Sequence, residues 1–297
     1  MTSRSTPSNP RIPFTLSSER RPLAGPGGKR IIVHVEVNVE AWPFDAPVPR
    51  ALLPAPHGMA PVPDVPNFTW FEYGVRCGLP RIIQALASRG LPASCAINAA
   101  VVDVYPSAAA AILDAGWELI GHGVVQRALD TETEAATISE SLDRLRAFSG
   151  QPVTGWLGPG LRETDATPDL LAAQGVTYVC DWGLDDVPCW MTTAHGPLIA
   201  LPNTLDHDDS LLYAVERHSS AEFHRRVVDT LATFDAEPDA AAGARVLTLG
   251  LHPHLIGATH RMPYLTGALD ILMARDDTVF MTGRDIAEWF RAACPVA

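Results

Sequence analysis

Short apolar strands alternate with amphipathic helices along most of this chain of 297 residues. Several helical stretches end at glycine, as at Gly90 and Gly116, and the next apolar run follows directly. Repeated strand–helix units give parallel strands covered by helices. The pattern predicts an α/β fold with a (β/α) barrel rather than an open dinucleotide-binding sheet, since the sequence shows neither a GxGxxG motif nor a P-loop.

The expected elements follow from apolar runs and helical spacing. Strands are predicted at residues 31–40, 91–98, 117–122, 154–157 (strand or turn), 176–181, 198–201, 245–251 and 278–281. Helices are predicted at residues 73–89, 107–115, 133–148, 167–174, 221–234, 263–274 and 283–293. Prolines crowd residues 41–67, which excludes helix there and predicts a loop able to wall a pocket. A loop rich in Ala, Asp and Glu precedes the strand at 245–251.

Length and composition limit the domain organisation and the partners. We expect an exposed arm over residues 1–30 and one catalytic domain over residues 31–297. The arm lacks the apolar core of a secretory signal, and no apolar stretch reaches the roughly 18–20 residues of a membrane span. A net charge of −12 argues against nucleic acid and anionic membrane as partners. Five cysteines without a CxxC pair predict a reduced, cytoplasmic chain with at least one free thiol.

Polar side chains stand at the ends of several predicted strands, where a parallel barrel carries its active site. Asn38 and Glu40 share one face of the first strand because side chains alternate along a strand. His122, Asp181 and His252 end three other strands. Each alone could be a helix cap or a packed loop residue, but their joint placement predicts a site.

Two of these groups suit proton transfer. Pro253 fixes the turn after His252, whose imidazole titrates near neutrality and could protonate a leaving nitrogen. Glu40 could act as a general base or as a metal ligand. His252 could instead pack the strand end, and Glu40 could be a solvated acid. Glu36 lies deeper on the same face, where a charge must be paired, so we expect a structural role.

The metal-binding potential of the third strand is incomplete. Two histidines about one helical turn apart could hold a divalent metal from one side. Here His122 is followed four positions later by Gln126, so one strong nitrogen ligand is missing.

Five segments taken together resemble the polysaccharide deacetylase (NodB-homology) family: residues 37–40, 71–74, 115–123, 155–160 and 251–253. The resemblance covers about residues 31–290. Residues 71–74 and 180–182 are similar to the branch that holds deacetylase-like allantoinases and cyclic imide hydrolases. The family resemblance implies a distorted (β/α) barrel in a single domain. Because relatives assemble as dimers or tetramers, it also implies a homo-oligomer.

Family members acting on N-acetyl sugars carry a base, a three-residue metal site and an arginine that steadies the base. The matching positions in this chain are Asn38, Glu40, His122, Gln126 and Leu157. The resemblance therefore leaves Glu40 and His122 as the metal ligands, so a divalent metal such as Zn²⁺ is an open alternative with an incomplete triad. The allantoinase branch is similar in lacking the full triad.

These departures favour ring opening of a small cyclic amide, imide or ureide. An unstrained acetamide needs a water whose pKa a well-held Zn²⁺ lowers to about 7. Cyclic imides and ureides have more electrophilic carbonyls and better leaving groups. We expect Glu40 to activate water, directly or through a metal shared with His122, and His252 to protonate the ring nitrogen.

Substrate contacts are expected from amides at the ring edges, from indoles stacked on its face and from an arginine that binds the carboxylate formed. The expected substrate-binding residues are Asn38, Gln126, Trp70, Glu72, Trp182 and Arg261. Two alternatives remain open. One is an N-deacetylase acting on an acetylated sugar or peptidoglycan fragment, and the other is a catalytically inactive barrel that binds a small molecule.

Overall fold

The computed structural model describes residues 7–55, 58, 61–237 and 243–296. Four parts of the sequence predictions lie outside them: residues 1–6 of the arm, residues 56–57 and 59–60 of the proline-rich segment, residues 238–242 of the acidic loop, and residue 297 of the catalytic domain. The strands are β1 (Ile31–Val39), β2 (Ser94–Ile97), β3 (Glu118–Gly121), β4 (Gly155–Trp156), β5 (Tyr178–Val179), β6 (Cys189–Met191), β7 (Leu198–Ala200), β8 (Arg245–Leu251) and β9 (Thr278–Phe280).

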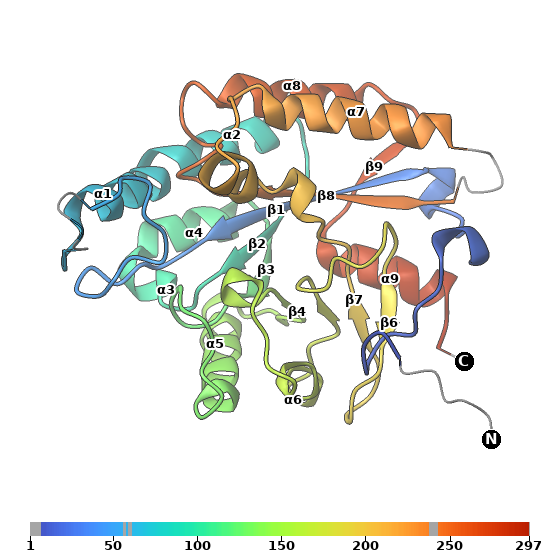
Figure 1. Cartoon of the computed structure of the whole chain (residues 1–297), viewed down its shortest axis with the longest axis horizontal. Helices are drawn as coiled ribbons and strands as arrows, with labels where there is room; N and C mark the ends of the chain where they lie inside the picture. The colour runs from blue at the N-terminus through green and yellow to red at the C-terminus, as the bar shows by residue number, and fades with distance from the viewer. Residues whose placement is uncertain (1–6, 56–57, 59–60, 238–242, 297) are drawn as a thin grey trace.

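Most of the helices lie outside the curled sheet, with α7 and α8 side by side across one flank (Figure 1). They are α1 (Val65–Tyr73), α2 (Leu79–Ala87), α3 (Val101–Val104), α4 (Pro106–Asp114), α5 (Glu134–Ser149), α6 (Thr167–Ala173), α7 (Glu222–Ala236), α8 (Met262–Met273) and α9 (Gly283–Ala293). Shorter turns are η1 (Ser17–Glu19), η2 (Pro26–Gly28), η4 (Gly74–Gly78), η5 (Pro159–Leu161), η6 (Leu205–His207) and η7 (Leu211–Val215).

The strands form one sheet in the order β6-β7-β5-β4-β3-β2-β1-β8, and β9 pairs with the start of β1. Every described pairing of these strands is parallel except that of β6 with β7. The predicted distorted (β/α) barrel is confirmed. The antiparallel strand β6 was absent from the prediction, because its three residues are too short a run for a local pattern to indicate a strand.

Strand β1 separates the two layers of the core. All nine of its residues are buried. Val33, Val35 and Val37 belong to the large apolar cluster that also contains residues of the outer helices. Ile32, on the other face, belongs to a second cluster within the barrel. Because side chains alternate along a strand, Glu36 shares that inner face and leads from the apolar floor toward the polar strand end.

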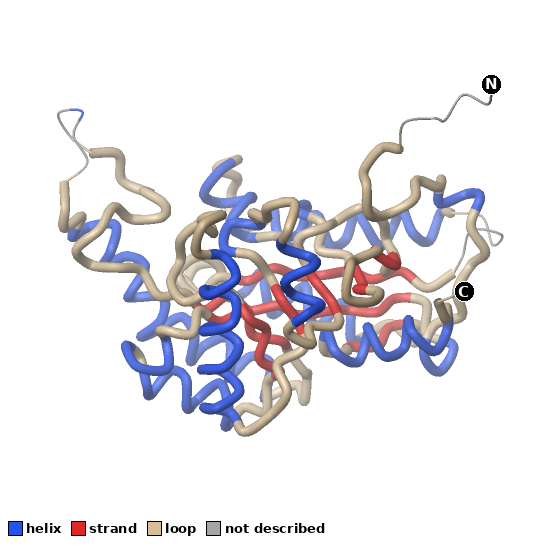
Figure 2. Tube along the Cα trace, turned by 90° about the horizontal axis from the view of Figure 1, so that it is seen from below, coloured by secondary structure: helices blue, strands red, loops and turns tan. Residues whose placement is uncertain are grey.

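Two helix predictions near the proline-rich segment need correction. Helix α1 begins inside the range expected to exclude helix, because Asp64 accepts the amide of Asn67 at 3.3 Å and Pro66 occupies the first turn. The helix expected at residues 73–89 starts as the wider turn η4 before α2. The proline-rich segment lies at the α1 end of the molecule, away from both termini (Figures 1 and 2).

The described part of the arm contacts the barrel. Ile12 is buried in the large apolar cluster, and Arg11 forms an ion pair with Asp169 at 2.9 Å. Further along, the carbonyl oxygen of Leu23 accepts the amide of Ala244 at 2.8 Å. The sequence analysis predicted an exposed arm. In the structure, parts of residues 7–30 instead pack against the barrel. Within the described residues, no helix is both long enough and apolar enough to cross a membrane.

Candidate active site

The strand register brings polar residues together at one end of the barrel. Residues paired across β1, β2, β3 and β4 are Val39, Ile97, Gly121 and Trp156. The next residue of each strand therefore meets its neighbours at this end: Glu40, Asn98, His122 and Leu157. On the other side of β1, Val37 pairs with Leu251, which places His252 beside Asn38.

Two connected cavities of about 310 and 340 Å³ open at this end. Their shared lining is Glu40, Arg50, Gln126, Gly160, Arg162, Ser210 and His252. The first cavity adds Glu36, Asn38, His122, Leu157 and Asp208, and the second adds Trp42, Arg127 and His254. Concave sites of this size suit small molecules. Asn38, Glu40, His122, Gln126 and His252 were predicted site residues, and the structure brings them together here.

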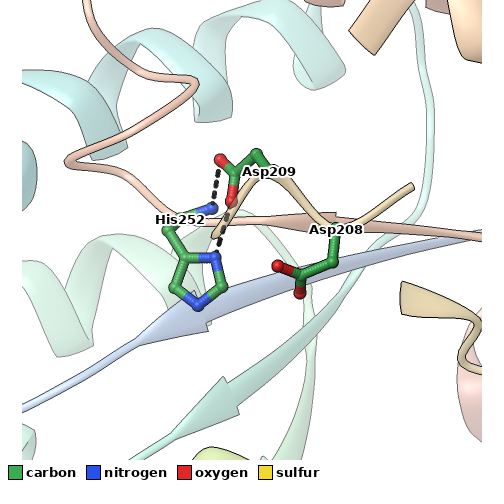
Figure 3. Close-up of side chains that lie close together, drawn as sticks. All are labelled: Asp208, Asp209 and His252. Atoms are coloured by element: carbon green, nitrogen blue, oxygen red, sulfur yellow. Dashed lines mark hydrogen bonds and ion pairs between the residues drawn. The ribbon is translucent and has the colours of Figure 1, made fainter. Parts of the chain in front are cut away.

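A buried carboxylate holds His252 in place (Figure 3). Asp209, in the segment after β7, lies 2.6 Å from the imidazole Nδ1, and its second oxygen accepts the backbone amides of His252 and Ile256 at 2.8 and 2.9 Å. Asp208 lies beside this pair but accepts the amides of Ser210 and Leu211. The contacts to Asp209 fix the ring, so that Nε2 is free for chemistry.

The Asp209 contact also sets the charge of His252. Burial lowers the pKa of His252, but the carboxylates of Asp209, Asp208 and Glu40 together outweigh burial and raise the pKa to about 9, with Asp209 contributing most. The imidazole is therefore protonated at neutral pH. Its Nε2 lies 3.7 Å from Oε1 of Glu40.

Glu40 faces His252 from the end of β1. Its side chain is buried, and Trp42 donates a hydrogen bond from Nε1 to Oε2. Burial raises the pKa of Glu40, while the charge of His252 and the Trp42 hydrogen bond oppose that rise. The indole occupies one carboxylate oxygen, and the other is presented to His252 and the cavity.

His122 offers an acceptor to the same cavity. Its Nδ1 lies 2.7 Å from the carbonyl oxygen of Leu157, which can only accept, so Nδ1 carries the proton. Nε2 is buried without a hydrogen-bond partner, and burial lowers the pKa of His122 to about 4. The ring is neutral, and the Nε2 lone pair is available to a ligand.

The side chains at the positions that match the family's metal ligands do not form a metal triad. Gln126 supplies a neutral amide, and its Oε1 lies 3.4 Å from Nδ2 of Asn98. Within the described residues, three ionisable donor atoms come within 4.8 Å of one another only at Asp208, Asp209 and His252. There Nδ1 of His252 is already bound to Asp209. Glu40 and His122 thus lack an ionisable third ligand for a metal ion.

Trp70 and Glu72, both in α1, do not line either cavity. Trp70 packs edge-on against His254, with ring centroids 4.7 Å apart, and Glu72 forms an ion pair with Arg76 at 2.8 Å. We predicted that Trp70 and Glu72 contact the substrate, but neither side chain lines the cavities. The aromatic residues near α1 build packing behind His254 instead of a stacking wall.

Trp182 and Arg261 also lie away from the cavity lining. Trp182 donates from Nε1 to Glu163 at 2.7 Å, and the guanidinium of Arg261 lies 4.1 Å from the ring centroid of Tyr213. Asp181 is equally occupied, because both its oxygens accept the amide of Gly158, at 2.8 and 2.9 Å. Trp182, Arg261 and Asp181 therefore contact partners within the protein and do not line the cavities.

Sequence reasoning missed several groups at the site. Asp208 and Asp209 are adjacent in the segment after β7. Their position in the sequence does not indicate that they lie beside His252. Glu36, expected to be structural, lines the first cavity. Its Oε1 accepts from Asn38 at 3.4 Å, Oε2 is buried without a partner, and burial raises its pKa to about 7. Arg50 was hidden in the proline-rich loop.

Known proteins resemble this chain in sequence and in fold. Residues 66–179 match the sequence model of the polysaccharide deacetylase family. A Schizosaccharomyces pombe protein provisionally named a polysaccharide deacetylase is 25% identical over 91% of this chain and 88% of its own length.

Solved structures share the fold. The crystal structure of Puue allantoinase has a TM-score of 0.81 at 24% identity, covering 94% of this chain and 96% of the other. A protein from Pseudomonas aeruginosa, provisionally named a polysaccharide deacetylase, has a TM-score of 0.81 at 24% identity, covering 94% of this chain and 97% of its own.

Proposed function

We propose that the chain is a C–N hydrolase that opens the ring of a small cyclic amide, imide or ureide, and its match to the polysaccharide deacetylase family model supports the hydrolase class. One observation carries the proposal. A buried carboxylate, Glu40, faces the protonated imidazole of His252 across 3.7 Å in the cavity at the strand ends. This pair supplies a base and an acid at neutral pH.

In the proposed reaction, Glu40 accepts a proton from water as the water oxygen bonds to the ring carbonyl carbon. His252 then donates its Nε2 proton to the ring nitrogen as the C–N bond breaks. The product carries a new carboxylic acid and a new N–H group. The proton held by Glu40 replaces the one lost by His252, through the product acid or solvent, so the site returns to its starting state.

Asp209 and His122 serve this reaction without exchanging protons. Asp209 keeps His252 protonated until the leaving nitrogen accepts the proton, as an orienting carboxylate does in a catalytic triad. Neutral His122 accepts a hydrogen bond from a ring N–H at its unpartnered Nε2. The amides of Asn38 and Gln126 line the same space and hydrogen-bond the ring edges.

The small ring is favoured over an acetylated sugar for two reasons. The donors present do not make a metal triad, and an unstrained acetamide needs the stronger activation that a metal gives. The match to a solved allantoinase shows that this fold also occurs in a protein named for cyclic ureide chemistry.

A substrate panel tests the proposal. The purified chain is incubated with succinimide, hydantoin, dihydrouracil and allantoin, and in parallel with N-acetylglucosamine oligomers. We expect a ring-opened product, heavier by one water in mass spectrometry, from at least one ring and no acetate from the oligomers. Acetate release without ring opening would establish the deacetylase alternative. Binding of a ring without turnover would establish the inactive barrel.

A further inference from the structure

Three arginines surround the mouth of the two cavities. Arg50 comes from the proline-rich loop, Arg127 from the segment between β3 and α5, and Arg162 from the segment after η5. Arg50 is half-buried, and the other two are exposed. The whole chain has 22 basic residues against 34 acidic ones. Three guanidinium groups from separate loops therefore concentrate positive charge at one opening of an acidic protein. We call them the arginine rim.

The protein contacts the side chain of Arg50 and constrains the backbone that leads to Arg162. Arg50 donates from Nη1 to the carbonyl oxygen of Ser210 at 3.3 Å. Arg162 follows a turn in which Gly160 and Leu161 both have positive φ, 66° and 57°. A leucine with positive φ is uncommon, and such backbone concentrates at functional sites. The Asp181 carboxylate anchors the start of this turn at Gly158. The turn therefore presents Arg162 to the cavity.

The interior of the cavity is lined by acidic side chains, whereas its mouth is lined by basic ones. Glu36, Glu40 and Asp208 line its inner part, and His252 is the one histidine there whose pKa is raised. An anionic ligand group placed at this depth would meet carboxylates. The same group at the mouth would meet guanidinium donors, which bind carboxylates through paired hydrogen bonds. Charge thus gives a ligand one favourable orientation, with its anion outward.

We propose that the cyclic substrate carries a carboxylate, which Arg50, Arg127 and Arg162 hold at the mouth while the ring faces Glu40 and His252. This inference rests on the proposed function and names the substrate class of the same site. The rim selects for charge and takes no part in the proton transfers.

Matched ligand pairs test the rim by binding. Dihydroorotate and dihydrouracil differ by one carboxylate on the same ring, as do 5-carboxymethylhydantoin and 5-methylhydantoin. Dissociation constants are measured by calorimetry on the Glu40→Gln protein, which keeps the rim and does not consume the ligand. We expect the carboxylate member of at least one pair to bind at least about tenfold more tightly, since hydrogen bonds to charged groups reach that size. Added salt should reduce the preference.

Arginine variants assign the preference to the rim. Adding Arg50→Gln or Arg162→Gln should weaken binding of the carboxylate member about tenfold and leave the neutral member unchanged. Arg21→Gln is the matched control, because Arg21 is exposed and does not line the cavities. In turnover by the otherwise native chain, the rim variants should raise KM for the carboxylate ring with kcat unchanged.

The outcomes separate the two proposals. No preference in either pair, or rim variants that weaken both members equally, overturns the arginine rim. Absence of ring opening across every substrate overturns the proposed function, and the binding preference still decides the role of the rim.

Discussion

Glu40 carries the proposed base chemistry, and its replacement gives the sharpest test at the scale of one residue. Glu40→Gln keeps the shape and the neighbouring Trp42 but removes the proton acceptor. We expect kcat for ring opening to fall by about 10²–10⁴-fold, the usual contribution of a positioned base. Glu72→Gln is the control, because Glu72 pairs with Arg76 outside the cavity. Equal rates for both variants and the native chain would remove Glu40 from the mechanism.

His252 predicts the pH dependence of turnover. Its pKa of about 9 means that the proton to be donated is present at neutral pH and is lost as pH rises through 9. We expect kcat/KM to fall on that alkaline side. Asp209→Asn removes the largest of the anionic contributions that raise this pKa, so the pKa should decrease from its native value. The fall should then move to lower pH. An unchanged profile would show that another group donates the proton.

The same pKa shift links folding to pH. A histidine whose pKa is higher in the folded state than its ordinary value of 6.5 adds stability that is fully present below pH 6.5. That contribution is lost as pH rises through about 9. Denaturant unfolding between these pH values should show the native chain losing stability with rising pH, and Asp209→Asn should lose less. A pH-independent difference between the two proteins would contradict the assignment.

Among the elements, η4 packs directly against the segment that carries His252. A Cβ on Gly74 would lie 2.3 Å from the backbone nitrogen and Cα of His254, so a side chain there must displace the backbone. We expect Gly74→Ala to reduce the free energy of unfolding by about 1–3 kcal/mol, as overpacking does. Activity should fall as well, because a displaced His254 backbone would also shift His252, two residues earlier in the chain.

Gly267→Ala is the matched control for this element. Gly267 lies in α8, and a Cβ there meets the side chain of His224 at 3.1 Å. A side chain can move where a backbone cannot, so we expect stability within about 1 kcal/mol of the native chain. Chemical denaturation of both variants measures the difference. Equal stability of the two variants would contradict the close packing of η4.

The strand ends could be predicted from sequence, and the loop contributions could not. Glu40, His122 and His252 follow apolar strands, and parallel pairing aligns such ends whatever the loops do. Asp209 and Arg50 reach the site through loops whose path depends on tertiary packing. Local patterns carry no signal for that path, and the short antiparallel strand β6 was missed for the same reason.

The predicted aromatic and arginine contacts failed for a related reason. The sequence analysis predicted that Trp70, Trp182 and Arg261 contact the substrate, but the sequence does not show which partner each side chain meets. Each found one within the protein: His254, Glu163 and Tyr213, respectively. Buried or half-buried polar groups are usually satisfied internally, so proximity in sequence to a strand end is weak support for a ligand contact.

At the scale of the whole molecule, the barrel is shared with a solved allantoinase and with a protein provisionally named a polysaccharide deacetylase. The fold fixes where the groups converge, and the residues at those positions decide the chemistry. Here they supply a base, a protonated imidazole and a neutral acceptor. The central claim is that this set opens a ring without a metal.

Ring opening by metal-free protein tests that claim most directly. The chain is treated with a chelator, its metal content is checked by elemental analysis, and turnover of the best substrate of the panel is followed by mass spectrometry. We expect the metal-free protein to retain the rate of the untreated protein, and Glu40→Gln to remain inactive under both conditions. Loss of activity on metal removal, with recovery on adding Zn²⁺, would contradict the proposed mechanism.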